Sequence, residues 1–210
     1  MSRDADIRLI LTRRSSRRFL AEEVPDEDLN LIIEAGLRAP SSKNSQPWFI
    51  AIAKGRVKDQ ICEWVVENPE RIPTKPGKLL IEEPAARPRD STFHTLRYVR
   101  AAPVLLLLFN RAPFSGGKNR MEHDIRNGKR VSFENEYVGI GACMENILLA
   151  THALGLGAIA VMDILPAASA IKERFEIDYD LVIGVAIGHT AEKRLPPRLL
   201  DMARFVRHLE

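Results

Sequence analysis

Residues 39–48 read Ala-Pro-Ser-Ser-Lys-Asn-Ser-Gln-Pro-Trp, a run of hydrogen-bonding side chains between two prolines. Directly before it, three acidic residues precede an apolar stripe at helical spacing, which predicts an amphipathic helix over residues 26–38. Directly after it, residues 48–53 form a short continuous apolar run, which is typical of a strand buried on both faces. We therefore expect a polar loop that joins a surface helix to a buried strand.

The rest of the chain continues this alternation of helices and strands. Residues 136–154 carry apolar side chains at helical spacing and are followed by Gly155, which predicts a long central helix with a glycine stop. Three further short apolar runs predict strands at residues 104–109, 159–161 and 181–187. We expect one globular domain over residues 1–210, with at least four strands.

Two long stretches do not show the pattern of either a helix or a strand. Residues 68–91 contain five prolines, and residues 110–130 are rich in Gly, Lys and Arg. Loops of this length in a compact domain usually cover sites or lack fixed structure, so we expect two long loops. The polar residues after Gly188, which include Pro196-Pro197, are expected to form an extended arm.

Composition narrows the class of protein without naming a function. The 210 residues are 45% hydrophobic, and no run approaches the roughly 18 apolar residues that a membrane span needs. Residues 1–12 are polar and charged, so we expect a cytoplasmic protein without a membrane partner. The cysteines, Cys62 and Cys143, lie far apart, which favours core thiols over a disulfide framework or a zinc site.

The charge of the chain is nearly balanced, but the basic residues are clustered. The chain has 31 basic and 28 acidic side chains, a net charge of +3. Residues 3–18 hold six arginines, residues 111–130 hold six Lys or Arg, and residues 193–207 hold five. Clusters of this kind suit binding of phosphate.

The first cluster ends in Arg13-Arg14-Ser15-Ser16-Arg17-Arg18. Alternate side chains of an extended chain share a face, so Arg13, Ser15 and Arg17 would project together over roughly 13 Å. Arginine offers a planar fork to phosphate, serine adds a neutral donor, and a second cation can stabilise negative charge on a flavin ring. Taken alone, the segment is more typical of a solvated strip or one that faces nucleic acid.

The basic segment and the polar loop together resemble the nitroreductase family of FMN enzymes. In that family an Arg-Arg-Ser-x-Arg opening is followed by a helix and a Pro-Ser-Ser-x-Asn-Ser-Gln-Pro-Trp loop, and both motifs occur here in that order. The likeness continues over residues 139–163, which resemble the central helix, its Gly-Leu-Gly turn and the next strand. It also covers residues 182–198, which resemble the closing strand and basic tail, so only the two long loops lie outside it.

The resemblance implies an FMN site assembled by a homodimer. The cofactor-binding residues that it implies are Arg13, Arg14, Ser15 and Arg17 at the phosphate and ring edge, Pro40, Ser41, Ser42 and Asn44 reaching the partner subunit's FMN, backbone groups near Met162 and Asp163 at flavin N5 and O4, and Arg198 closing on the phosphate. The flavin carries the chemistry, so no catalytic side chain is assigned, and Arg17 is expected to tune the ring.

The chain departs from the family's pattern at two places. Pro196 stands where many relatives have a lysine, so one phosphate cation is missing or is supplied by Lys193 or Arg194. Met162-Asp163 stands where some relatives have Glu-Gly. A free carboxylate there would repel an anionic hydride donor or orient a substrate.

Other patterns in the chain are weaker indications of function. The Gly-x-Gly pairs at residues 139–141 and 155–157 do not complete a dinucleotide loop, so close packing and a helix stop explain them better. A group of acidic residues and a histidine lacks the spacing of metal ligands, so we expect no metal and a solvated face. This group is Glu122, His123, Asp124, Glu134 and Glu136.

The alternation of helices and strands, together with the resemblance, leads to an α+β fold with three layers, in which helices flank a central mixed or antiparallel sheet. The resemblance further implies a C-terminal arm that is exchanged in a homodimer. The expected activity is FMN-dependent transfer of electrons from NADH or NADPH to a small flat acceptor, such as a nitroaromatic or a quinone, by a ping-pong mechanism. One alternative is another flavin reaction, reductive dehalogenation or flavin breakdown, with residues 110–135 as a substrate lid. A flavin-binding protein without turnover and a nucleic-acid-binding domain are the others; we expect no nucleic-acid partner.

Overall fold

The apolar runs of the sequence form one antiparallel sheet in the order β1-β2-β4-β3. The computed structural model describes residues 3–68, 91–127, 133–192 and 205–209. The strands are β1 (Trp48–Lys54), β2 (Val104–Asn110), β3 (Gly157–Val161) and β4 (Asp180–Gly188). All four strand predictions are confirmed in position.

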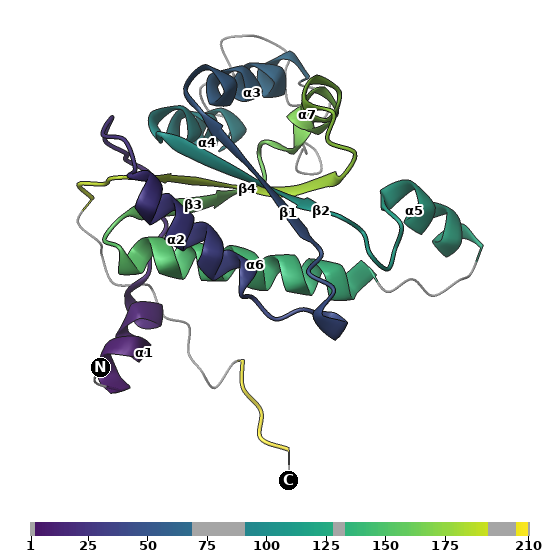
Figure 1. Ribbon diagram of the computed structural model, residues 1–210, viewed down its shortest axis with the longest axis horizontal. Coiled ribbons are helices and arrows are strands. Elements are labelled where there is room, and N and C mark those ends of the chain that lie inside the picture. Colours follow the sequence, from purple (N-terminus) through teal and green to yellow (C-terminus); the bar gives the residue numbers. More distant parts are fainter. Residues whose placement is uncertain (1–2, 69–90, 128–132, 193–204, 210) are drawn as a thin grey trace.

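Helices cover both faces of this sheet and make the three layers visible in Figure 1. The helices of the described residues are α1 (Arg3–Thr12), α2 (Asp26–Leu37), α3 (Gly55–Glu67), α4 (Ser91–Ala101), α5 (Lys118–Arg126), α6 (Phe133–Ala153) and α7 (Ala168–Phe175), with the short 3-10 helices η1 (Ser42–Asn44) and η4 (Leu165–Ala167). Helices α2 and α6 lie on one face, and α3, α4 and α7 lie on the other. The expected α+β arrangement, with an antiparallel sheet flanked by helices, is confirmed.

Each face of the sheet buries its own apolar cluster. Alternate residues of β2, such as Leu106 and Leu108, pack toward α2 and α6, whereas Leu105 and Leu107 pack toward α3, α4 and η4. This division follows from the period of two along a strand. Strand β2 is buried along its whole length because it has a strand on each side and helices on both faces.

The prediction that the first strand is buried on both faces is wrong for part of β1. Strand β1 lies at one edge of the sheet, and the side chains of Phe49 and Ile52 are 37% and 48% exposed. An apolar run shows that residues prefer burial, but it does not show whether a strand has one neighbour or two.

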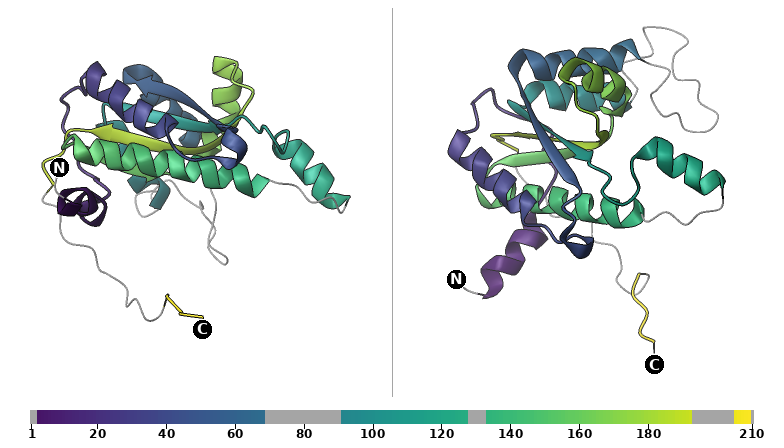
Figure 2. Two further views of the ribbon diagram at one scale, coloured as in Figure 1. Left: turned by 60° about the horizontal axis from the view of Figure 1, so that its bottom comes forward. Right: turned by 45° about the vertical axis from the view of Figure 1, so that its right-hand side comes forward.

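The amphipathic helix and the long central helix are confirmed as α2 and α6. Gly155 follows α6 with φ +77°, a left-handed conformation that favours glycine, so its expected role as a helix stop is also confirmed. Figure 2 shows α1 against the side of α6 that faces away from the sheet.

The prediction of a continuous loop over residues 110–130 is wrong, because residues 118–126 form α5. Two ion pairs at helical spacing stabilise this helix: Arg120 with Asp124 at 3.8 Å and Arg126 with Glu122 at 3.9 Å. Helix α5 projects away from the body of the domain in Figures 1 and 2. Most of residues 68–91 lie outside the described residues.

The two cysteines are buried thiols, as expected. Burial raises the pKa of the Cys143 thiol to about 12 and also raises the pKa of Cys62. Both thiols therefore stay protonated at neutral pH. Among the described residues, the structure contains no helix that is long and apolar enough to cross a membrane.

Candidate functional site

The basic segment, residues 13–17, lies beside the first residues of β3. The backbone N–H of Ser16 donates to the carbonyl of Ala158 at 2.9 Å, and Ser15 forms a parallel bridge with the same residue. The chain is therefore extended at this point, with successive side chains on opposite sides. Ser15 is half-buried, whereas Ser16 is buried.

Ser16 is a residue of this segment whose role the sequence did not indicate. Its hydroxyl lies only 2.6 Å from where a Cβ at residue 157 would be, and its own Cβ lies at 2.7 Å. Gly157 therefore allows the basic segment to approach β3 closely, because any larger residue would displace Ser16. The second glycine of the Gly155-Leu156-Gly157 turn was a usable signal, since an isolated glycine at a strand end often marks close backbone approach.

The arginines of the basic segment differ in their surroundings. Arg13 is half-buried, and its Nε lies 3.3 Å from Oε1 of Glu145 on α6. Arg14 is also half-buried, and its guanidinium donates to the carbonyl of Arg13 at 2.8 Å. Arg17 is exposed, and its backbone N–H donates to the carboxylate of Glu192 at 2.8 Å. The segment thus presents a cluster of cations at the start of β3.

The polar loop, residues 39–47, holds several residues in rarely populated backbone conformations. Lys43, Asn44 and Gln46 have φ angles of +53°, +52° and +45°. Each such residue costs on the order of 1 kcal/mol, so the surrounding structure must hold the loop in place. Strain of this kind is often found at binding sites.

Hydrogen bonds within the polar loop stabilise this shape. The hydroxyl of Ser41 accepts from the backbone N–H of Gln46 at 3.0 Å, and the side chain of Gln46 donates to Asn44 at 3.2 Å. Ser41 and Ser42 are half-buried, whereas Pro40 and Asn44 are exposed. The loop therefore has a fixed backbone and presents part of its surface for contact.

The polar loop packs against the N-terminal half of α6. A Cβ at residue 139 would lie 3.2 Å from Cγ of Pro47 and 3.4 Å from Cβ of Ser41. The expectation that Gly139 serves close packing is confirmed. Arg111, just after β2, donates its backbone N–H to the carbonyl of Pro47 at 2.7 Å, and its Nη1 donates to the carbonyl of Gln46 at 3.3 Å.

Met162 and Asp163 follow the other end of β3. Met162 is 60% exposed, and Asp163 is half-buried. The Asp163 carboxylate accepts a hydrogen bond of 2.8 Å from the hydroxyl of Thr92, a buried residue of α4. The carboxylate expected to be free is therefore bonded to α4, a contact that depends on residues 71 positions apart.

The structure places the expected site residues in three groups. Arg13–Arg17 lie at the start of β3, and Met162–Asp163 follow its end, roughly 16 Å farther along the strand. Pro40–Asn44 lie elsewhere, beside Gly139 of α6. Arg198, with Lys193, Arg194 and Pro196, lies outside the described residues.

Gly139 and Glu145 mark where the polar loop and the basic segment meet α6. They are six residues apart, so they lie roughly 9 Å apart along the helix and roughly 120° apart around it. The loop and the basic segment of one chain therefore contact different sides of α6.

The donors along β3 fit the FMN that the resemblance implies. Two half-buried arginines and a half-buried serine provide charged and neutral donors for a phosphate at the Gly157 end. The opposite end provides backbone groups of Met162 and Asp163, and the separation suits an elongated molecule with a phosphate at one end and a ring at the other. Arg17 adds an exposed cation, and its backbone is bonded to Glu192 beyond the end of β4.

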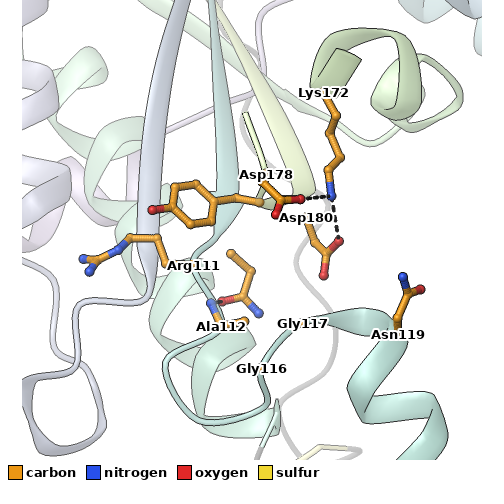
Figure 3. A pocket seen from close by; sticks show the side chains of 10 residues that line it. Arg111, Ala112, Gly116, Gly117, Asn119, Lys172, Asp178 and Asp180 are labelled. Atoms are coloured by element: carbon orange, nitrogen blue, oxygen red, sulfur yellow. Dashed lines mark hydrogen bonds and ion pairs between the residues drawn. The ribbon is translucent and has the colours of Figure 1, made fainter. Parts of the chain in front are cut away.

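A separate polar pocket of about 320 Å³ lies at the far end of the sheet (Figure 3). It is lined by residues around the end of β2, the start of β4 and the start of α5, among them Arg111, Gly117 and Asp180. Lys172 pairs there with Asp178 at 3.2 Å and with Asp180 at 3.9 Å. Because Asp180 and Gly188 are opposite ends of β4, this pocket lies roughly 27 Å from the basic segment.

Glu136, beside this region, corrects one expectation. Its position among other acidic residues predicted a solvated face, but the side chain is fully buried. Burial by itself raises a carboxyl pKa, yet hydrogen bonds from Asn110, Ser115 and Phe114 outweigh it and hold the pKa of Glu136 below its ordinary value. The acidic residues around it gave no signal that distinguished Glu136 from an exposed neighbour.

Comparison with protein families gives a match over most of the chain. The model described as "Nitroreductase family" matches residues 10–189. This range contains the basic segment, the polar loop, all four strands and Met162–Asp163.

Individual relatives extend the comparison. The chain is 26% identical to a 4-nitrobenzoate reductase of Nocardioides sp. over 86% of this chain and 78% of that protein. It is 39% identical to nitroreductase NfnB of Mycolicibacterium smegmatis over a shorter region, 28% of this chain and only 25% of that protein. An iodotyrosine deiodinase of Thermotoga neapolitana is 32% identical over 49% of this chain and 55% of that protein.

Solved structures share the fold. The crystal structure of FMN-dependent nitroreductase NfnB from Mycobacterium smegmatis, in complex with NADPH, superposes with a TM-score of 0.72. The superposition covers 99% of both chains at 22% sequence identity. At this identity, the likeness supports the arrangement of helices and strands.

Proposed function

This chain belongs to the nitroreductase family, and from that premise we infer that it is an FMN-dependent oxidoreductase. It passes electrons from NADH or NADPH to a small flat acceptor such as a nitroaromatic or a quinone. The observation that carries this proposal is the contact of Ser16 with Ala158, which sets the basic segment against the first residues of β3, the strand that ends just before Met162. A basic strip that only faced solvent would not require the close approach at Gly157.

The bound FMN supplies hydride and electron transfer, and the side chains bind and orient it. Arg13, Arg14 and Ser15 bind the phosphate through charge-assisted and neutral hydrogen bonds. Arg17 would supply a guanidinium near the ring, which would stabilise negative charge there. The backbone groups of Met162 and Asp163 would bind the ring of the flavin from the other end of β3.

The hydrogen bond between Thr92 and Asp163 bears on the presence of Met162-Asp163 where some relatives have Glu-Gly. Thr92 holds the Asp163 carboxylate toward α4 by a bond of 2.8 Å. A carboxylate held in this way is directed toward α4, which limits its repulsion of an anionic nicotinamide donor. The bond also restrains the backbone that follows β3.

We propose that the active form is a homodimer and that each FMN lies between two protomers. The basic segment and the polar loop meet different sides of α6, which favours their serving two different flavins. Helix α1 exposes Ile7, Ile10 and Leu11 by 53%, 56% and 62%, which is apolar area suited to a second copy. The exposed Phe205 and Leu209 suit the exchanged C-terminal arm.

The segment that contains α5 is the proposed cover of the acceptor site. It begins next to the polar loop, to whose carbonyl groups Arg111 donates hydrogen bonds. In the proposed dimer, that loop would reach the partner's flavin. In a ping-pong mechanism the nicotinamide leaves before the acceptor occupies the same ring face, so a cover at this position sets which acceptors enter.

The similarity to an iodotyrosine deiodinase favours one alternative reaction, reductive dehalogenation. That reaction would use the same FMN site with a halogenated aromatic as acceptor. It differs from the first proposal in the acceptor and not in the residues that hold the cofactor.

Anaerobic spectroscopy of the FMN-loaded protein tests the proposal. NADH or NADPH should bleach the flavin absorption, and a nitroaromatic, a quinone or a halogenated phenol should restore it. Restoration by the halogenated phenol alone would select dehalogenation. A flavin that binds but is bleached by neither nucleotide would indicate a binding protein, and a colourless, salt-sensitive nucleic-acid binder would overturn the proposal.

A further inference from the structure

One carboxylate outside the flavin site is the centre of a dense polar cluster. Glu136, in the first turn of α6, is fully buried. Its Oε1 accepts from the backbone N–H groups of Phe114 and Ser115, each at 2.8 Å. Its Oε2 accepts from Nδ2 of Asn110 and Oγ of Ser115, each at 2.7 Å. Four donors converge on the group, so it is bound as a carboxylate.

The cluster organises the α5 base, which we define as residues 110–117 between β2 and α5. Oδ1 of Asn110 accepts from the backbone N–H of Ala112 at 2.8 Å, and Oγ of Ser115 accepts from the N–H of Gly117 at 3.4 Å. Gly116 and Gly117 have φ angles of +71° and +93°, so the backbone turns sharply just before the helix. The turn is therefore wrapped around a single buried charge.

Helix α5 is connected to the domain through this base. Of its described side chains, Asn119, Arg120, Glu122, His123, Ile125 and Arg126 are exposed. The helix projects from the body of the domain in both views of Figure 2. Because most of its described side chains are exposed, the conformation of the α5 base contributes strongly to where α5 points.

The same end of α6 also holds the polar loop. Gly139, close to one turn after Glu136, contacts Pro47 and Ser41. Arg111, within the α5 base, donates to the carbonyls of Pro47 and Gln46. The α5 base and the polar loop are thus joined to each other and to one helix, so displacement of one changes the support of the other.

We propose that Glu136 is a positioning residue that holds the α5 base against the polar loop and thereby sets the position of α5 over the acceptor site. It acts through Phe114, Ser115 and Asn110 and does not touch the substrate. This inference rests on the proposed function, in which the polar loop reaches the flavin and α5 covers the acceptor. The negative charge is part of the role, because each of the four partners donates a hydrogen.

Moving the carboxylate from residue 136 to residue 110 separates a role of the charge from a role of the size of the Glu136 side chain. In Glu136→Gln, the new amide group would face the amide of Asn110, so two donors would meet. Rotation of the Asn110 amide by half a turn would not relieve this clash without losing another hydrogen bond, because its Oδ1 accepts from the backbone N–H of Ala112. Adding Asn110→Asp restores complementarity: the carboxylate accepts from Ala112 and from the new amide, whose other hydrogen can bond Oγ of Ser115.

The experiment compares the wild-type FMN-loaded protein with Glu136→Gln, the double variant Asn110→Asp/Glu136→Gln, and the control Glu134→Gln. Glu134 lies in the same first turn of α6 but is exposed, so its substitution removes the same charge from the helix end. The first readout is hydrogen exchange at the backbone N–H groups of Phe114 and Ser115. The second is kcat/KM for benzoquinone, with the FMN dissociation constant measured alongside.

Glu136→Gln should speed exchange at both amides by about tenfold or more, because the clash with Asn110 disturbs the acceptor of the N–H groups of Phe114 and Ser115. It should also lower kcat/KM for the acceptor by about tenfold through KM, with FMN affinity within about twofold of wild type. The double variant should recover both readouts, and Glu134→Gln should change neither.

Three results would overturn the inference. Unchanged exchange in Glu136→Gln would show that the carboxylate does not hold the α5 base. Faster exchange with unchanged acceptor kinetics would show that the charge contributes to stability without positioning α5. A folded double variant as impaired as the single one would show that hydrogen-bond complementarity between residues 110 and 136 is not what positions α5. If the wild-type flavin is not reduced by NADH or NADPH, the proposed function fails. The exchange readout still reports whether Glu136 holds the α5 base.

Discussion

Helix α6 carries Glu136 in its first turn and Glu145 in its second half, and the two regions around them hold charge in opposite ways. Glu136 is fully buried and accepts four hydrogen bonds of 2.7–2.8 Å from the α5 base. Glu145 is 44% exposed and meets Arg13 of the basic segment through one contact of 3.3 Å. The hydrogen-bonding capacity of Glu136 is filled by groups inside the protein, whereas the region around Glu145 presents cations at the surface.

The difference separates a structural charge from a binding charge. A buried charge must find its partners inside the protein, because an unsatisfied one is strongly destabilising. An exposed ion pair contributes little to stability, so Arg13 can exchange Glu145 for an anionic ligand at small cost. We therefore expect substitutions near Glu136 to affect stability and α5, and substitutions in the basic segment to affect the cofactor.

The largest effect should follow from Glu136→Ala, which tests the structural side of the comparison. Removing the carboxylate leaves buried donors of the α5 base without an acceptor and should lower the free energy of unfolding by about 3 kcal/mol. Denaturant unfolding of the cofactor-free protein measures it. Glu145→Ala is the matched control and should cost less than about 1 kcal/mol. Equal losses for the two variants would remove the distinction.

Arg13→Ala tests the binding side. Loss of a charge-assisted phosphate contact should raise the FMN dissociation constant about 30-fold, equivalent to about 2 kcal/mol. Stability of the cofactor-free protein should change by less than about 1 kcal/mol, because the Arg13–Glu145 pair is partly exposed. Flavin fluorescence titration and thermal unfolding measure the two quantities. Lower stability with unchanged affinity for FMN would show that Arg13 is a structural charge and not a binding charge.

Arg17→Ala sharpens the comparison within the basic segment. Arg17 is exposed and is assigned to the ring edge, so its removal should shift the flavin reduction potential downward by about 30 mV, or about 1.4 kcal/mol for two electrons. The affinity for FMN should fall less than in Arg13→Ala. A redox titration against a dye of known potential measures the shift. An unchanged potential with an affinity loss as large as that of Arg13→Ala would contradict the role.

The smallest effect at neutral pH concerns titration of Glu136. Its folded pKa lies below the ordinary value of 4.5, because the hydrogen bonds overcome the effect of burial. The stabilisation is therefore fully present above that ordinary value and is lost as pH falls through the lower folded pKa. The stability difference between wild type and Glu136→Gln should stay constant from pH 8 to about pH 5 and shrink below it. A difference that shrinks within that range would indicate a raised pKa.

The parts of the fold that depend on local periodicity were predictable. The four strands and helices α2 and α6 follow from apolar spacing, and Gly155 marked the end of α6. Helix α5 was missed because its segment is polar, with charged pairs at helical spacing and only a short apolar stripe. The exposure of Ile52 depends on which strand occupies the sheet edge, which no local pattern contains.

The candidate site was predictable as a set of residues and less so as an arrangement. Motif resemblance named the basic segment and the polar loop, but the contact of Ser16 with Gly157 joins residues far apart in the chain. The bond from Thr92 to Asp163 and the burial of Glu136 have the same origin. Each depends on a contact between residues far apart in the chain, and such contacts produce no periodic pattern in the sequence.

The central claim is that the basic segment of one protomer and the polar loop of its partner hold the same FMN. Differently tagged Arg13→Ala and Asn44→Ala chains, co-expressed and purified as heterodimers, test it directly. Each heterodimer should contain one intact site and one doubly altered site, and should show roughly half the FMN binding and NAD(P)H-dependent turnover of wild type. Both homodimeric variants should fall well below that level. A heterodimer no more active than the average of the two homodimers would contradict the claim.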